Sequence, residues 1–170
     1  MSNSNFESEF WNQRFSGEEF TYGTEPNLFF KESIDKLSPG KILLIGEGEG
    51  RNALYAAKLG WTVDAVDFSS TASDKALQLA DKNNVTINYK IENLALFNPL
   101  TNYYDAVGII FVHLEPEMRI QVHQRLFDSL ANGGRVIMEV FSKSQLGKST
   151  GGPQDLSMLY SEDDVRKTFP

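Results

Sequence analysis

A glycine-rich loop between an apolar run and a helical pattern constrains the fold of this chain more than any other feature. Residues 41–45 (KILLI) form a short apolar run, which is typical of a strand buried on both faces of a parallel sheet. The run leads into residues 46–50 (GEGEG), and a helical pattern over 52–59 then ends at Gly60. Glycines at such a junction let the backbone turn tightly and let a ligand approach closely. This arrangement predicts the first strand–loop–helix unit of an α/β domain, with a ligand at the loop.

Strands and helices continue to alternate along the rest of the chain. Further strands are predicted over 61–66, 86–91, 104–112 and 135–141, and further helices over 71–82, 118–130 and 162–169. Before the first strand, helices are predicted over 6–15 and from Pro26 through Ile34. Ser70 and Ser161 are expected to cap the helices that follow them, and Pro26 is expected in the first turn of its own helix. Alternation of this kind indicates a mostly parallel sheet with right-handed crossovers and helices on both faces.

An acidic residue ends the second predicted strand at a position suited to a ribose. Asp67 lies 21 positions after Gly46, and ligands of parallel sheets bind at the carboxyl ends of the strands. A carboxylate placed there can accept hydrogen bonds from both ribose hydroxyls. The alternative interpretation is a tight strand-to-helix turn in which Asp67 is a solvated helix cap.

The charge of the glycine loop bears on which nucleoside cofactor it binds. Residues 48–53 also satisfy the dinucleotide pattern G-x-G-x-x-A. However, Glu47 and Glu49 would repel the pyrophosphate of a dinucleotide, and Arg51 offsets that repulsion only in part. S-adenosylmethionine has no phosphate and carries a sulfonium and an ammonium, which either glutamate could attract. The loop therefore favours S-adenosylmethionine, with an NAD-binding domain as a weaker alternative.

Three stretches of the sequence resemble a known enzyme family. Residues 42–69 (ILLIGEGEGRNALYAAKLGWTVDAVDFS) resemble the first motif and the following acidic motif of class I S-adenosylmethionine-dependent methyltransferases. Residues 11–15 (WNQRF) and 22–27 (YGTEPN) resemble the N-terminal lid of the small branch that includes tellurite-resistance and thiopurine methyltransferases. The resemblance extends from about Phe10 to the end of the chain. It implies a Rossmann-like sheet of order 3-2-1-4-5.

The resemblance also implies a set of cofactor-binding residues. They are Gly46, Gly48 and Gly50 against the methionine portion and the ribose, Asp67 on the ribose hydroxyls, Phe68 on the adenine, and Asn93 and Leu94 at the adenine edge. Phe111, Val112 and His113 would flank the transferring methyl group. Trp11, Arg14 and Tyr22 would close over the cofactor, with Arg14 near its carboxylate.

The sequence departs from the family pattern at two of these places. The family often has an acid two residues before the first glycine, where this chain has Leu44, and Glu47 is expected to substitute for it. Asn93 stands where the family has an aspartate. Its amide oxygen can still accept a hydrogen bond from the adenine amino group, so we expect cofactor binding to be kept.

His113 is the candidate catalytic residue, because it directly follows the fourth strand. It could act as a general base for the acceptor, or it could be a histidine packed at a strand end. Methyl transfer from a sulfonium often needs only alignment and desolvation. The other histidine, His123, is expected on the surface. No metal site is expected, because the chain has no cysteine and its acidic pairs have no histidine nearby.

Composition narrows the partners and the cellular location. The formal net charge is −7 and the basic residues do not cluster, which disfavours a nucleic-acid partner and suits a small-molecule acceptor. No apolar run approaches the ~20 residues that a membrane helix needs, and the N-terminus does not have the pattern of a signal peptide. The sequence therefore predicts a cytoplasmic protein without a membrane partner.

The sequence is expected to form a single methyltransferase domain over residues 1–170. Within it, 1–38 form the lid and first helix, 41–141 the cofactor-binding core, and 142–170 an acceptor-side loop and last helix. The family sheet ends in two antiparallel strands, six and seven, which have no counterpart in the predicted pattern. The fifth strand would then be a bare apolar edge, which indicates either a fragment of a longer protein or a homodimer formed through that edge.

These observations predict an enzyme that transfers the methyl group of S-adenosylmethionine to a small molecule and leaves S-adenosylhomocysteine. The alternative from another class is a non-catalytic module that keeps the cofactor site.

Overall fold

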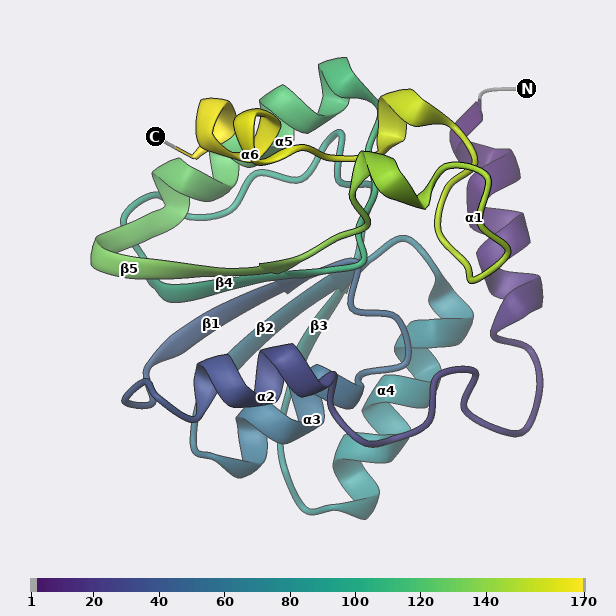
Figure 1. The fold of residues 1–170 in the computed structure, drawn as a ribbon. Coiled ribbons are helices and arrows are strands. Elements are labelled where there is room, and N and C mark those ends of the chain that lie inside the picture. Colours follow the sequence, from purple (N-terminus) through teal and green to yellow (C-terminus); the bar gives the residue numbers. More distant parts are fainter. Residues whose placement is uncertain (1–2, 170) are drawn as a thin grey trace.

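The computed structural model describes the backbone of residues 3–169 and the side chains from residue 8 onward (Figure 1). The helices are α1 (Asn3–Arg14), α2 (Leu28–Ile34), α3 (Arg51–Lys58), α4 (Ser70–Lys82), α5 (Pro116–Ser129) and α6 (Glu162–Thr168). The strands are β1 (Lys41–Ile45), β2 (Thr62–Asp67), β3 (Asn88–Ile91), β4 (Tyr104–Ile110) and β5 (Leu130–Glu139). Short 3₁₀ turns at Lys143–Gln145 and Leu156–Met158 lie in the loop between β5 and α6.

The strands form one parallel sheet in the order β3-β2-β1-β4-β5, so the predicted topology is confirmed. β1 lies at the centre, and four of its five residues are buried. Alternate residues of a strand face opposite sides, so Ile42 and Leu44 enter one core cluster while Leu43 and Ile45 enter the other. This is why the KILLI run is apolar throughout.

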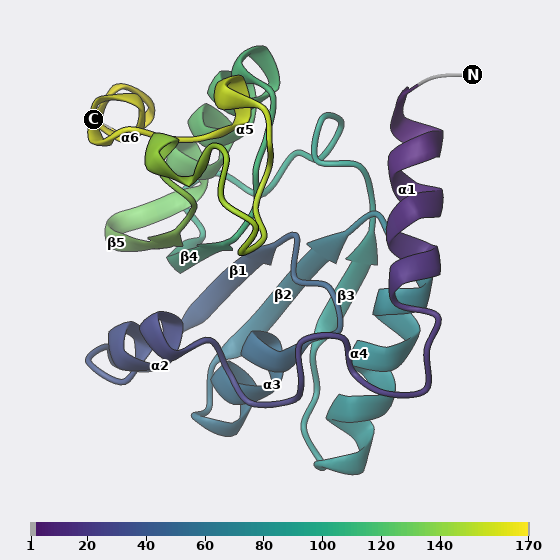
Figure 2. The ribbon, with the colours of Figure 1, turned by 45° about the vertical axis from the view of Figure 1, so that its right-hand side comes forward.

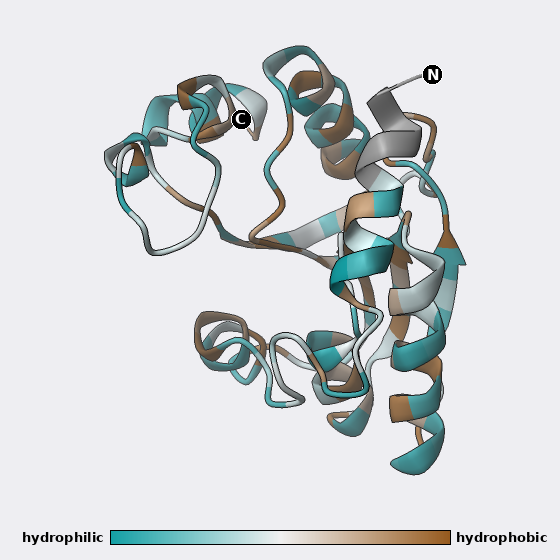
Figure 3. Ribbon diagram, turned by 90° about the vertical axis from the view of Figure 1, so that its right-hand side faces the viewer, coloured by the Kyte–Doolittle hydropathy of each residue, from teal (hydrophilic) through white to brown (hydrophobic). Residues whose placement is uncertain are grey.

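Helices cover both faces of the sheet. The first cluster joins the sheet to residues of α2, α3 and α4, and the second joins it to α5 and to Phe169 at the end of α6. Figure 1 shows these two layers below and above the strands. Figure 3 shows hydrophobic residues concentrated on the strands and on the inward faces of the helices. α1 stands apart from both layers, beside α4 (Figure 2).

Two helix starts differ from the predicted ones because a neighbouring side chain makes the better cap. Ser69, not Ser70, caps α4, and its hydroxyl accepts a hydrogen bond from the Ala72 amide. Asn27 caps α2 through the Phe30 amide, so Pro26 lies just outside the helix instead of opening it. The predicted cap at Ser161 is confirmed, with a reciprocal bond from its own amide to the Asp164 carboxylate.

The ends of β4 and β5 also differ from the predicted ranges. β4 ends at Ile110 because Phe111 adopts a left-handed backbone conformation, with φ of 56°. β5 begins at Leu130, and its pairing with β4 is shifted so that Tyr104 lies opposite Leu130 and Ala106 opposite Arg135. The predicted turn over 132–134 is therefore an irregular part of the strand, with Gly133 left-handed.

His123 is buried, not exposed as predicted. It shares the inward face of α5 with Arg119, Val122 and Leu126, at intervals of three and four residues. Its Nδ1 atom lies 2.9 Å from the Thr168 hydroxyl of α6, and its ring stacks on Phe169. The residue therefore joins α5 to α6.

Candidate functional site

The glycine loop leaves the carboxyl end of β1 in a conformation that requires glycine. Gly46, Gly48 and Gly50 all have positive φ, and Gly50 is the left-handed cap of α3. A Cβ atom at Gly46 would lie 2.6 Å from the Val112 side chain, and one at Gly50 would lie 2.6 Å from Ala76. The loop is therefore held tightly between the end of β4 and helix α4.

Asp67 is bonded to the glycine loop across the ends of β1 and β2. One carboxylate oxygen accepts the Gly48 amide at 3.0 Å and the other accepts the Ser69 amide at 2.9 Å. The side chain is only 7% exposed, and burial raises the pKa of its carboxyl above the ordinary value. Asp67 is thus a buried carboxylate at the loop, and the alternative of a solvated helix cap does not describe it.

Glu47 caps helix α3. One of its carboxylate oxygens accepts the amides of Asn52 at 2.9 Å and Ala53 at 2.7 Å, which are among the free N–H groups of the first helical turn. Burial raises the pKa of the Glu47 carboxyl to about 7. The expectation that Glu47 attracts a cofactor ammonium is therefore revised, because this side chain is already directed at the helix terminus.

Glu49 is also engaged within the protein. Its carboxylate accepts the Thr21 amide at 2.7 Å and pairs with the Lys75 ammonium at 2.6 Å. The expectation that Glu49 attracts the ammonium is revised for the same reason.

The N-terminal segment reaches the glycine loop through Trp11, which the sequence singled out, and through Asn12 and Phe15, which it did not. Phe15 is buried, a Cβ atom at Gly48 would lie 3.4 Å from its ring, and Trp11 stacks on that ring with centroids 5.4 Å apart. The Asn12 amide oxygen accepts hydrogen bonds from the Ser69 hydroxyl and the Thr71 amide. Figure 2 shows α1 standing beside the carboxyl end of β3 and above α4.

Arg14 and Tyr22, two of the residues predicted to close over the cofactor, are exposed and bond to each other. The Arg14 guanidinium donates to the Tyr22 hydroxyl at 3.1 Å, and both residues are exposed. Arg14 also lines an open hollow of about 310 Å³ with Phe10, Gln13 and Thr21. The contact between Arg14 and a cofactor carboxylate stays a prediction.

Tyr89 of β3 was not predicted as a site residue. Its hydroxyl donates to the Gly48 carbonyl at 2.7 Å, while Asp67 accepts the Gly48 amide. Gly48 is therefore held on both sides. The alternation of side chains along β3 could have indicated Tyr89, because it lies two residues before the carboxyl end of that strand.

The three residues expected at the adenine differ in their exposure and in the hydrogen bonds that they already make. Phe68 is partly exposed next to Asp67, as the prediction requires. The Asn93 amide oxygen accepts the Ala95 amide at 2.8 Å, so it is used in a local turn. Leu94 is buried in the second core cluster with residues of α5, and its contact with the adenine edge stays a prediction.

Phe111 lies at the carboxyl end of β4 with its ring 40% exposed. Its left-handed backbone is uncommon for a bulky residue, and strain of this kind is concentrated at functional sites. Its amide donates to the Glu139 carbonyl, and its ring stacks on Phe141 at 4.9 Å.

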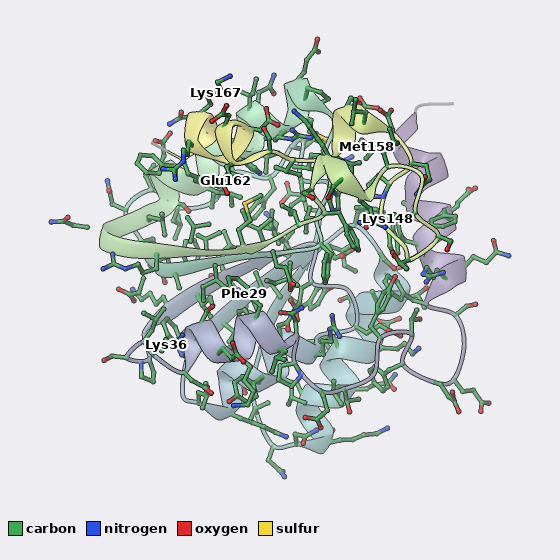
Figure 4. All side chains as sticks on the ribbon, in the orientation of Figure 1. Phe29, Lys36, Lys148, Met158, Glu162 and Lys167 are labelled. Carbon is green, nitrogen blue, oxygen red and sulfur yellow. The ribbon has the colours of Figure 1, made fainter. Side chains whose placement is uncertain are left out.

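Both ring nitrogens of His113 are occupied. Nε2 accepts the Phe141 amide at 3.2 Å, so Nδ1 carries the proton and donates to the Met158 carbonyl at 3.0 Å. Burial also lowers the pKa of this histidine. Met158, labelled in Figure 4, belongs to the loop on the opposite side of the sheet from Phe29 of α2. Of the two interpretations of His113, the arrangement favours the packed histidine, because no lone pair is free to accept a proton.

The structure therefore gathers the three glycines, Asp67, Phe68 and Phe111 at the carboxyl ends of β1, β2 and β4. Within the described part of the chain, no three histidine or acidic side chains lie where they could hold a metal ion. No helix among residues 3–169 is both long enough and apolar enough to cross a membrane.

Comparisons with known proteins agree on one family. The family model described as "Tellurite resistance protein TehB" matches residues 20–167. Two curated Haemophilus influenzae proteins, each named "Probable S-adenosyl-L-methionine-dependent methyltransferase TehB", are 24% identical over 135 residues, which is 78% of this chain. That match covers 46% of each relative, so the chain spans about half the length of these relatives.

Solved structures share the fold. The crystal structure of TehB from Haemophilus influenzae has a TM-score of 0.71 at 18% identity, over 95% of this chain and 54% of that one. The phosphoethanolamine N-methyltransferase 2 of Haemonchus contortus, in complex with S-adenosyl-L-methionine, has a TM-score of 0.70 at 21% identity, over 94% of this chain and 39% of that one.

Proposed function

The chain belongs to the TehB family of tellurite resistance proteins, and from that premise we propose that it transfers the methyl group of S-adenosylmethionine to a small-molecule acceptor. S-adenosylhomocysteine would be the second product. The site would be the carboxyl ends of β1, β2 and β4, around the glycine loop. The acceptor would be a small molecule with a nucleophilic atom that approaches the methyl group from the β4 and β5 side.

One observation carries the choice of cofactor. In dinucleotide-binding folds the pyrophosphate lies on the N-terminus of the helix after the glycine loop. Here the Glu47 carboxylate already accepts the amides of Asn52 and Ala53 at that terminus. A pyrophosphate would have to displace the buried Glu47 carboxyl group from these amides, whereas a cofactor without phosphate needs no such room. The residues present therefore fit S-adenosylmethionine better than NAD.

We assign the binding roles as follows. The three loop glycines would let the methionine portion and the ribose lie against the backbone, because their positive φ angles give the loop a tight turn that other residues rarely adopt. Asp67 would accept the ribose hydroxyls, and Phe68 would lie against the adenine. Glu47 would hold the loop indirectly by fixing the start of α3. The cofactor, once bound, supplies a methyl group on a positively charged sulfur, and that sulfur keeps the bonding electron pair when the methyl group leaves.

The chain's own residues would align the reactants and exclude water. The Phe15 ring, with Trp11 stacked on it, lies beside Gly48 and would help to keep the loop dry. Phe111, with its ring against Phe141, would form the apolar wall beside the methyl group. His113 would act by fixing Phe141 and not by taking a proton, because both its nitrogens are engaged. An acceptor that is already nucleophilic at neutral pH suits a site of this kind.

A small acceptor is supported by charge and by the relatives. The net charge of −7 disfavours a polyanionic partner. One protein with the same fold is named for phosphoethanolamine, a small molecule. The non-catalytic module remains the second candidate, since nothing in the site is a dedicated acid or base.

Product formation tests the proposal. The purified chain would be incubated with S-adenosylmethionine and, in turn, a thiol, a selenide, tellurite and an amine, and S-adenosylhomocysteine would be measured by mass spectrometry. The proposal predicts acceptor-dependent product that is lost in the Asp67→Ala variant. Cofactor binding without product for any acceptor class would favour the non-catalytic module.

A further inference from the structure

A buried ion pair lies outside the residues assigned to the cofactor. Glu49, in the middle of the glycine loop, pairs with Lys75 of α4 at 2.6 Å, and their side chains are only 4% and 14% exposed. Surface ion pairs contribute little, but removing one partner of a buried pair leaves an uncompensated charge. A carboxylate and an ammonium this deep in the protein therefore depend on each other.

The Glu49–Lys75 pair also bonds to the segment between α1 and α2. The chain between α1 and α2, residues 15–27, runs past α4 and α3 (Figure 2), and we call residues 19–22 of this connection the strap. The Lys75 ammonium donates to the Glu19 carbonyl at 2.7 Å and lies 5.2 Å from the centre of the Phe20 ring. The Glu49 carboxylate accepts the Thr21 amide at 2.7 Å. Three successive residues of the strap therefore close around the pair.

The glycine loop also lies close to α4 at this place. A Cβ atom at Gly50 would lie 2.6 Å from the Cβ of Ala76, the residue next to Lys75. Arg51, on the other side of Gly50, donates to the Tyr22 carbonyl at 3.2 Å. The loop is thus enclosed by α4 on one side and by the strap on the other, and the ion pair joins all three.

We propose that Lys75 is a positioning residue for the cofactor site, which through its ion pair with Glu49 holds the strap and α4 against the glycine loop. Lys75 does not contact the proposed cofactor position itself. It acts by keeping Glu49 turned away from the loop's ligand face and by anchoring the segment from which α1 extends over the site. The expected effect on cofactor affinity rests on the proposed function. The contacts of Lys75 and Glu49 with each other and with the strap, which we call the latch, are present in the protein without a ligand.

The first measurement needs no ligand. The Thr21 amide is bonded to Glu49, so its hydrogen exchange, followed by NMR on the full chain, reports on the latch. The Lys75→Met variant, which keeps the length of the side chain but removes its charge, should exchange Thr21 at least tenfold faster than wild type. Lys82→Met, on the exposed face of the same helix, is the matched control and should leave Thr21 unchanged. Equal Thr21 exchange in wild type and Lys75→Met would overturn the latch.

The second measurement is the dissociation constant of S-adenosylhomocysteine, by titration calorimetry on the same proteins. Lys75→Met should raise it about tenfold, because the unpaired Glu49 loosens the loop, and Lys75→Arg, which keeps the charge, should recover most of the loss. Faster Thr21 exchange with an unchanged dissociation constant would overturn the positioning role. If Lys75→Met does not fold, both measurements are made on Glu49→Gln and Lys75→Arg. Glu49→Gln, which loses a charge, should speed Thr21 exchange and weaken binding, and Lys75→Arg, which keeps its charge, should do neither. A wild-type chain that binds no S-adenosyl compound would instead refute the proposed function. The exchange of Thr21 would still show whether Lys75 holds the strap, because that measurement needs no ligand.

Discussion

At the scale of single residues, two buried carboxylates beside the glycine loop have different functions. Asp67 bonds to the loop itself, while Glu47 bonds to the start of α3. The sequence indicated both carboxylates, because acids beside glycines are visible in it. It did not indicate where the Glu47 side chain points, because that depends on the left-handed torsions of Gly46 and Gly48. The sequence also did not indicate that the Asn93 amide oxygen accepts the Ala95 amide in a local turn, and its contact with the adenine stays a prediction.

Replacing Asp67 tests the ribose site. Asp67→Ala should cost about 2–3 kcal/mol of affinity for S-adenosylhomocysteine, because charge-assisted bonds to two hydroxyls are lost. Titration calorimetry measures this, with exposed Asp74→Ala on α4 as the control. A variant whose affinity stays within twofold of wild type would remove Asp67 from the site.

Replacing Glu47 tests its buried position through pH. Its pKa in the folded protein, about 7, lies above the ordinary value of 4.5. Its contribution to stability is therefore fully present below pH 4.5 and is lost as the pH rises through 7. Urea unfolding should show Glu47→Gln gaining about 2 kcal/mol relative to wild type between pH 5 and pH 8. A stability difference that does not change with pH would show that Glu47 is solvated.

At the scale of elements, the sequence predicted most of the fold, because its strands are short apolar runs between clear helix signals. β1 has the predicted bounds, and the strand order is the predicted one. The errors lie at caps where two suitable residues are adjacent, as with Ser69 and Ser70. They also lie on α5, where the polar residues Arg119 and His123 concealed a buried stripe. The Glu49–Lys75 pair could not be predicted, because it joins residues 26 apart through the contact of Gly50 with α4.

The docking of α1 is an element-scale feature that a single change can test. Asn12 is the residue of α1 that bonds to the segment after Asp67. Asn12→Ala should weaken binding of S-adenosylhomocysteine by about 1 kcal/mol, since the hydrogen bonds that hold α1 over the site are lost. The melting temperature should change little, because α1 lies outside both core clusters. Exposed Gln13→Ala is the control, and equal affinities of the two variants would show that α1 is not a lid.

At the scale of the whole molecule, the packing of α5 and α6 on the sheet should respond to acid. Burial lowers the pKa of His123 from its ordinary 6.5 to about 4, with the Arg119 charge adding to the effect. The stability linked to neutral His123 is therefore present above pH 6.5 and is lost as the pH falls toward 4. Between pH 7.5 and pH 5, wild type should lose about 2 kcal/mol of unfolding free energy relative to His123→Gln. Parallel pH profiles of the two proteins in urea would contradict this.

The central claim is that the glycine loop binds S-adenosylmethionine because Glu47 occupies the position that a pyrophosphate would need. Titration calorimetry of the wild-type chain with S-adenosylmethionine and with NAD, under identical conditions, tests it most directly. We predict saturable binding of S-adenosylmethionine with one site per chain, and no measurable heat with NAD. Saturable binding of NAD, with none of S-adenosylmethionine, would contradict the account.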